Sequence, residues 1–277
     1  MRHLIWISLL LFSCKKETTA ETPATSRENR KITYNNQTVD IIIEKPAAAA
    51  ADVLMVFHGS VAFDRDLMTA ANTTLDQFKN ILDRKDMMII SVIYPQENVL
   101  LGDNIVVGEA ALLWLKNKAS QELGIQVKKI FLGGHSQGGY MVTRLNTLHA
   151  TNGVIANAPG PFNLVYRCGL EEAGTAQASS FCTRLRNTYG ITTSNPAAYF
   201  NRSLLNFTKG FKSDIIFFQG LNDSPIQMYS WPVFKQEVQN CSTCQQVQIV
   251  EIPGGEHPAL FEIPSARAPF NNFINSR

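Results

Sequence analysis

One serine of this chain stands in a glycine-rich stretch whose residue types suit acyl-transfer chemistry. Residues 128–140 read K-K-I-F-L-G-G-H-S-Q-G-G-Y and contain the pattern Gly134-x-Ser136-x-Gly138. A serine hydroxyl that stands above a sheet edge needs a sharp, strained turn between a strand and a helix. The backbone two residues before the serine and two residues after it nearly touch in such a turn, so glycine is needed at both places. The pattern predicts Ser136 as a nucleophile.

A serine nucleophile needs a base, and the base needs an acid that orients it. Beyond Ser136 the sequence offers two histidines, His149 and His257, and two aspartates, Asp214 and Asp223. His149 is expected about thirteen residues along the helix that follows the serine, so the helix axis would carry it away. Asp214 precedes an apolar strand, whereas Asp223 follows it, and His257 follows the last strand. Ligands collect at the carboxyl ends of parallel strands, so Ser136, Asp223 and His257 are the predicted triad.

Backbone N–H groups are expected to stabilise the oxyanion of such a reaction. Gln137 opens the helix that follows the serine. Its N–H can therefore point at the developing charge, and the positive end of the helix dipole adds to this effect.

The elements that must position these groups follow from the pattern of apolar residues. Buried strands are expected at 53–57, 87–93, 130–132, 154–156, 215–218 and 247–252. Helices are expected at 67–84, 104–123, 226–238 and 258–274, as well as directly after Ser136. Asn35-Asn36 is a hairpin signal between two N-terminal strands. The alternation predicts an α/β protein with a mostly parallel sheet and helices on both faces. Residues 159–210 break the rhythm and are expected as a cap-like insertion over the active site.

Four ordered motifs resemble the α/β-hydrolase family over about residues 31–277. They are H-G after the third strand, the serine turn, an acid after the seventh strand and a histidine after the eighth. The stretch Q-G-L-N-D-S-P-I at 219–226 is similar to the H-G-x-x-D-x-x-V turn of esterases and prolyl-oligopeptidase-like members. Gln219 stands where the family has a non-catalytic histidine. The resemblance implies the α/β-hydrolase fold and a second oxyanion donor at Ser60, or at Val61 if the loop is set one residue later.

The resemblance implies an exported serine esterase that cleaves a small-molecule or polymer-borne carboxylic ester through an acyl-enzyme. Feruloyl, acetyl-sugar and short polyester substrates all fit the subgroup with these motif spellings. Two alternatives are a serine peptidase of the prolyl-oligopeptidase type and a non-catalytic binding protein on a hydrolase scaffold. No metal-ligand cluster, cofactor motif or basic run typical of nucleic-acid binding appears in the sequence. A monomer is the default expectation.

The N-terminus has the composition of a targeting segment. Residues 1–13 carry one arginine and then an apolar run that is too short to span a bilayer. Leu11-Phe12-Ser13-Cys14 resembles the lipobox of bacterial lipoproteins, so Cys14 is the predicted lipidation site and membrane anchor. The alternatives are an ordinary signal peptide cut elsewhere and an uncleaved anchor. Residues 14–30 are expected as a flexible tether, and the predicted location is the bacterial cell envelope.

The four remaining cysteines of an exported chain allow three disulfide pairings. We favour Cys168–Cys182 inside the insertion and Cys241–Cys244 before the last strand. The first pair would close a loop of about fifteen residues, which is worth about 3 kcal/mol in the chain-entropy model. Cys241-x-x-Cys244 could instead be a redox motif or half of a zinc site, but the sequence contains no second C-x-x-C.

Overall fold

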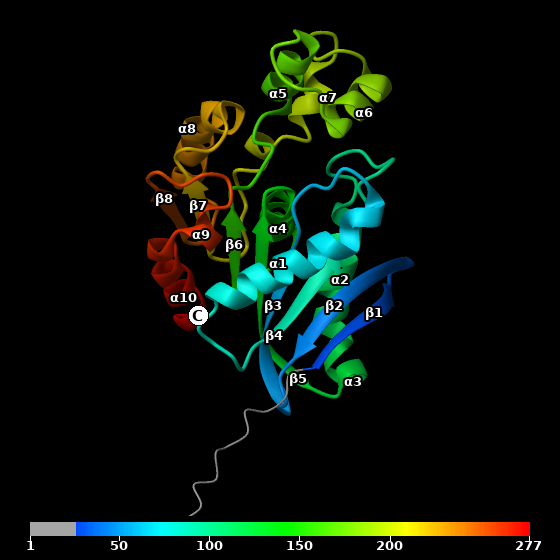
Figure 1. Ribbon diagram of the computed structural model, residues 1–277, viewed down its shortest axis with the longest axis vertical. Coiled ribbons are helices and arrows are strands. Elements are labelled where there is room, and N and C mark those ends of the chain that lie inside the picture. Colours follow the sequence, from blue (N-terminus) through cyan, green and yellow to red (C-terminus); the bar gives the residue numbers. More distant parts are fainter. Residues whose placement is uncertain (1–25) are drawn as a thin grey trace, which may run out of the picture.

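The computed structural model describes residues 26–277, which contain one eight-stranded sheet in the order β1-β2-β4-β3-β5-β6-β7-β8. β1 and β2, and β2 and β4, pair antiparallel, whereas all other neighbours pair parallel. The strands are β1 Ser26–Tyr34, β2 Gln37–Lys45, β3 Ala50–Phe57, β4 Met88–Ile93, β5 Gln126–His135, β6 Gly153–Asn157, β7 Ile215–Gly220 and β8 Val247–Ile252. The predicted fold class is confirmed (Figure 1).

Helices cover both faces of this sheet (Figure 1). They are α1 Leu67–Ile81, α2 Ile105–Asn117, α3 Ala119–Leu123, α4 Gln137–Leu148, α5 Leu164–Glu172, α6 Ser180–Tyr189, α7 Pro196–Phe200, α8 Pro225–Gln239, α9 Ala259–Glu262 and α10 Arg267–Asn275. Short 3-10 turns lie at η1 Asp64–Asp66, η2 Leu204–Asn206 and η3 Pro264–Ala266. Among the residues that the structure describes, no helix is both long and apolar enough to span a bilayer.

The continuous apolar runs of the sequence become strands that are buried on both faces, because side chains alternate across a sheet. In β3, Val53 and Met55 pack into a core shared with α2, α4 and α8. Leu54 and Val56 face the opposite core, which α1, α9 and α10 close. The sheet is thus packed between two apolar cores, one on each face.

Two expected boundaries are wrong. The first strand begins at Ser26, so residues 26–30 belong to the sheet and not to the tether. Their backbone pairs with β2, and Arg27 donates to Glu44 at 2.6 Å, so an edge strand forms without apolar side chains. The expected helix at 104–123 is two helices that meet at Lys118. The predicted signal peptide, Cys14 and the rest of the tether lie outside the described residues.

The predicted hairpin turn is confirmed. Asn35 and Asn36 join β1 to β2 with φ angles of 47° and 62°. Asparagine tolerates this left-handed region better than most residues, which is why the Asn-Asn pair marks the turn.

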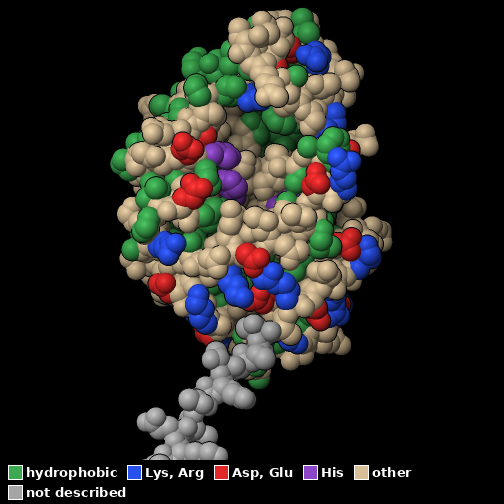
Figure 2. All heavy atoms as spheres, in the orientation of Figure 1, with side chains coloured by type: hydrophobic (Ala, Val, Ile, Leu, Met, Phe, Trp, Pro, Cys, Tyr) green, Lys and Arg blue, Asp and Glu red, His purple; other side chains and the backbone are tan. Residues whose placement is uncertain are grey.

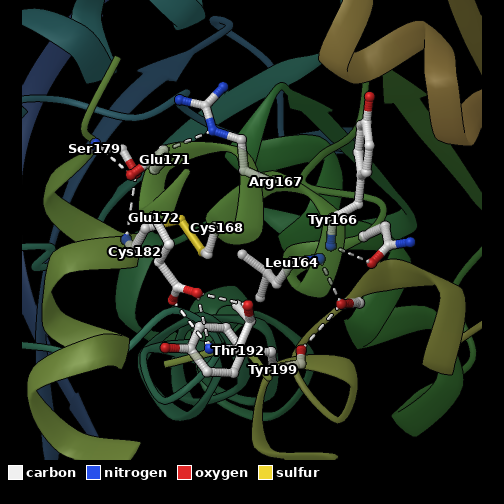
Figure 3. Close-up of a disulfide and its surroundings, with 12 residues drawn as sticks. Leu164, Tyr166, Arg167, Cys168, Glu171, Glu172, Ser179, Cys182, Thr192 and Tyr199 are labelled. Atoms are coloured by element: carbon white, nitrogen blue, oxygen red, sulfur yellow. Dashed lines mark hydrogen bonds and ion pairs between the residues drawn. A yellow bond between two sulfur atoms is a disulfide. The ribbon is translucent and has the colours of Figure 1, made fainter. Parts of the chain in front are cut away.

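The insertion at 159–210, hereafter the cap, contains α5, α6, α7 and η2 and stands beyond the carboxyl edge of the sheet (Figure 1). Its own apolar core is small and is built around Leu164, Leu185, Tyr199 and the buried cysteines Cys168 and Cys182. Those two sulfur atoms lie 1.95 Å apart and tie α5 to α6 (Figure 3). The structure pairs the four cysteines as expected.

The second cysteine pair belongs to the body of the domain. Cys241 and Cys244 have sulfur atoms 2.01 Å apart in the turn between α8 and β8. A C-x-x-C segment whose sulfurs are bonded in this way serves as a short staple of the turn.

Candidate active site

Ser136 lies at the junction of β5 and α4 with φ 56° and ψ −117°. A non-glycine residue with positive φ is strained and is held there by its surroundings. A Cβ atom on Gly134 would lie 2.1 Å from the Gly138 carbonyl oxygen, and one on Gly138 would lie 1.9 Å from that of Phe57. The predicted reason is confirmed for Gly134, whereas Gly138 is needed because its backbone lies directly against the end of β3.

Asp223 and His257 meet at the same edge. Asp223 follows β7, His257 follows β8, and the His257 Nδ1–Asp223 Oδ2 distance is 2.7 Å. Burial opposes ionisation of Asp223, but hydrogen bonds from His257, from Gln219 and from the Ser224 N–H outweigh it and lower the pKa of the carboxyl. An ionised carboxylate only accepts hydrogen bonds, so His257 Nδ1 carries a proton, and in the neutral imidazole the free lone pair is then on Nε2.

Gln219 takes part in the site in a way that the sequence did not predict. Its Nε2 donates to Asp223 Oδ2 at 2.9 Å, while the Ser224 N–H donates to Oδ1 at 2.6 Å. In the sequence, Gln219 stands only at the place of a non-catalytic histidine. The amide in fact supplies a hydrogen bond that holds the acid, and its position four residues before Asp223 is the signal that pointed there.

The loop after β3 decides between the two expected oxyanion donors. The Val61 N–H donates to Gln96 Oε1 at 2.9 Å, so this group is already bonded. Ser60 Oγ donates to Gln137 Oε1 at 2.8 Å and ties the loop to the first residue of α4. The Gln137 N–H opens α4 and has no partner within that helix. Because the Val61 N–H is bonded, Ser60 is the remaining candidate donor from the loop.

Two further histidines flank the site and stay neutral. His58 is buried against Tyr94, with ring centroids 4.2 Å apart, and burial lowers the pKa of His58 to about 4. The His135 ring lies 4.9 Å from that of His257. Burial, and then the nearby His257, lower the pKa of His135 to about 3. Of these three histidines, only His257 bonds the carboxylate that follows β7.

The residues rejected by elimination lie elsewhere, as predicted. His149 directly follows α4, and its Nε2 lies 2.6 Å from Glu109 Oε1. Asp214 precedes β7 and accepts from Arg277 Nε at 3.0 Å. A strand of β7's length therefore separates Asp214 from the carboxyl edge.

A cleft of about 410 Å³ contains Ser136, Asp223 and His257 in its wall. Ser60 lines it from the β3 loop, and Phe162, Phe181 and Arg167 line it from the cap. The molecular surface is hollowed below the cap, with histidine side chains at the hollow (Figure 2). The volume falls within the range of about 300–1,000 Å³ that is typical of small-molecule sites.

Comparison with known proteins establishes the fold. No protein-family model matches the chain. No curated protein matches it either. Among solved structures, a thermostable esterase from Pseudomonas putida is similar with TM-score 0.63 and 16% identity, over 90% of this chain and 81% of that one. A thermophilic carboxylesterase cloned from a metagenomic library matches with TM-score 0.64 and 17% identity, over 93% and 90% of the two chains.

A third similar structure comes from a fungus. Carboxyl esterase 2 from Tuber melanosporum matches with TM-score 0.63 and 15% identity, over 95% of this chain and 89% of that chain. The chain has the α/β-hydrolase fold, as the order of its motifs predicted.

Proposed function

We propose that this protein is a carboxylic ester hydrolase that works through Ser136, His257 and Asp223. The observation that carries the proposal is the His257–Asp223 contact of 2.7 Å, in the wall of the cleft that also contains the strained Ser136. The named structural neighbours are esterases, which favours an ester substrate over a peptide.

The proposed reaction has two acyl-transfer steps. His257 Nε2 takes the proton of the Ser136 hydroxyl while the oxygen attacks the ester carbonyl. Asp223 keeps the imidazole in the required tautomer and stabilises the imidazolium. The N–H groups of Ser60 and Gln137 receive the oxyanion, and removal of one such donor typically costs about 3 kcal/mol of barrier lowering. His257 then protonates the leaving alcohol, and water repeats the attack on the acyl-enzyme.

A substrate panel tests this proposal against its alternatives. The purified full-length protein would be assayed on p-nitrophenyl acyl esters and on peptide p-nitroanilides. We expect turnover of short acyl esters and no turnover of the anilides. Turnover of anilides alone would indicate a peptidase, and no turnover of either class would indicate a binding protein.

We also propose export and a lipid anchor at Cys14, which lies before the described residues. The motif Leu11-Phe12-Ser13-Cys14 supports this. Metabolic labelling with palmitate in a bacterial host should mark the wild type, and Cys14→Ser should lose the label and move to the soluble fraction. A label that survives this substitution would refute the anchor.

A further inference from the structure

The wall of the cleft contains one arginine that the proposed chemistry does not use. Arg167 projects from α5 of the cap and lines the same cleft as Ser136. Among the described residues of this cleft it is the only side chain that is permanently cationic. Of the two carboxylates in the wall, Asp223 is bonded to His257, and Glu256 lies exposed at the rim, where solvent screens its charge.

One hydrogen bond holds the guanidinium of Arg167 in place, and its terminal N–H donors remain available. Its Nε donates to Glu171 Oε1 at 2.8 Å, one turn along α5. Glu171 has a side chain only 2% exposed, and its second oxygen accepts the Ser179 N–H at 2.8 Å. In Figure 3 the terminal nitrogens of Arg167 lie beyond the bonded Nε and point away from Glu171. No hydrogen bond joins these two nitrogens to any residue of 26–277 that lies around them.

This arrangement is suited to binding a carboxylate. A guanidinium offers five N–H donors in a planar fork, and Glu171 uses one of them. The contact with Glu171 fixes the orientation of the fork, so little further freedom is lost when a second carboxylate binds. The wall of the cleft also contains the apolar side chains Phe162, Phe181 and Ile226. The Phe181 ring centroid lies 5.8 Å from the Arg167 guanidinium carbon.

We infer that Arg167 is a specificity-determining residue and that the preferred substrate is an ester with a free carboxylate on a short apolar body, such as a half-ester of a dicarboxylic acid. This inference rests on the proposed ester hydrolysis at Ser136. The carboxylate binds the two terminal nitrogens of Arg167, the apolar part of the substrate contacts the phenylalanines, and the ester carbonyl lies at Ser136.

Two matched pairs of esters test the inference. In one pair the charge is on the acyl part: mono-p-nitrophenyl glutarate against p-nitrophenyl pentanoate. In the other pair it is on the alcohol part: 4-carboxyphenyl butyrate against phenyl butyrate. The readout is the ratio of kcat/KM for the charged ester to that for the neutral ester, measured with the full-length protein. We expect a ratio above one in at least one pair.

In Arg167→Gln that ratio should fall by about 10- to 100-fold, as expected for a lost hydrogen bond between charged groups. Arg167→Lys should keep part of the preference, since the charge remains but the fork is lost. Arg186→Gln is the matched control, because Arg186 lies in the same cap on α6 but does not line the cleft. Its ratio should equal that of the wild type.

A structural role for Arg167 would give a different result. Arg167→Gln leaves the buried Glu171 without its partner, so the double variant Arg167→Gln, Glu171→Gln removes both charges and guards against misfolding. If both variants lower charged and neutral turnover equally, or if the wild type shows no preference in either pair, the inference is wrong while ester hydrolysis stands. If the wild type hydrolyses none of the four esters, the proposed function itself fails.

Discussion

The sheet and the cap of this protein are held together in different ways. β3, β4, β6 and β7 are buried strands between two large apolar cores, and backbone hydrogen bonds fix their register. The cap has a small core, the Cys168–Cys182 disulfide, and helix caps such as the Asn163 Oδ1 contact with the Tyr166 N–H at 3.1 Å. Protein interiors are close-packed, so a change in the volume of one side chain is felt by the side chains around it.

The difference assigns separate tasks to the two regions. The groups proposed for bond breaking, Ser136, Asp223 and His257, all follow strands of the sheet. The cap contributes Arg167 and the phenylalanines to the cleft wall, and no residue of the proposed triad. In our account the sheet sets the reaction and the cap sets the substrate, so changes in the two regions should have separable effects.

Glycine substitutions should give the largest contrast between the regions. Gly138→Ala should destabilise the fold by more than about 4 kcal/mol, because its Cβ would overlap the Phe57 carbonyl oxygen, a backbone atom of the buried β3. Gly174→Ala in the cap has the same chemistry, but nothing lies within 4 Å of its Cβ. Its φ of 71° should cost only about 1–2 kcal/mol.

Urea unfolding followed by circular dichroism would measure both glycine variants. If Gly138→Ala unfolds at a concentration close to that of Gly174→Ala, the backbone of the serine turn is not held as tightly as we describe.

Two aspartates at opposite ends of β7 should give the next contrast. Asp223→Asn should lower kcat about 10⁴-fold, because His257 loses its required tautomer. Asp214→Asn should change kcat little, since Asp214 contacts Arg277 at the far end of the strand. The measurement is kcat on a p-nitrophenyl ester, with circular dichroism to confirm folding. A crippled Asp214 variant beside a normal Asp223 variant would contradict the triad assignment.

Removal of the cap disulfide should loosen the cap and leave the sheet intact. The double variant Cys168→Ser, Cys182→Ser should lower the free energy of local cap opening by about 3 kcal/mol. Amide hydrogen exchange should then accelerate in α5 and α6 but not in β5. Replacement of Cys241 and Cys244 by serine is the control, with a shorter loop worth about 2 kcal/mol and no effect on cap exchange. Equal acceleration of cap and sheet would show that the two do not open separately.

The pH dependence of the rate should show the smallest effect. The pKa of His58 is about 4 and that of His135 about 3, so both stay neutral between about pH 5 and 8. On the acidic side of this range, kcat/KM should therefore fall by at most tenfold per pH unit, the slope of a single ionisation. A steeper fall between about pH 5 and 7 would mean that a second histidine must also lose its proton.

The sequence alone predicted most of the sheet and the positions of the site residues. Short apolar runs such as Val53–Phe57 are typical of buried strands, and the expected last strand, 247–252, is correct at both ends. Elimination could narrow the candidates for the acid and the base because the chain offers few of them, and because a strand places its two ends far apart. Asp214 and Asp223 were therefore separable without any contact information.

The features that the sequence did not predict depend on tertiary contacts, which leave no periodic pattern in the sequence. Residues 26–30 are the polar beginning of the edge strand β1. They are held in the sheet by backbone pairing with β2, which leaves no apolar pattern in the sequence. The bond between Gln219 and Asp223 depends on how the loop after β7 turns. The position of Arg167 in the cleft wall depends on the fold of the cap, which the irregular pattern of 159–210 does not specify.

The central claim is that Ser136 is the nucleophile, and covalent labelling tests it most directly. The wild-type protein would be treated with a fluorophosphonate, digested, and examined by mass spectrometry, with Ser136→Ala treated in parallel. We predict a single phosphonylated serine in the peptide that contains Ser136, and no label on a folded Ser136→Ala protein. A label on another serine, or undiminished labelling and ester turnover in Ser136→Ala, would contradict the account.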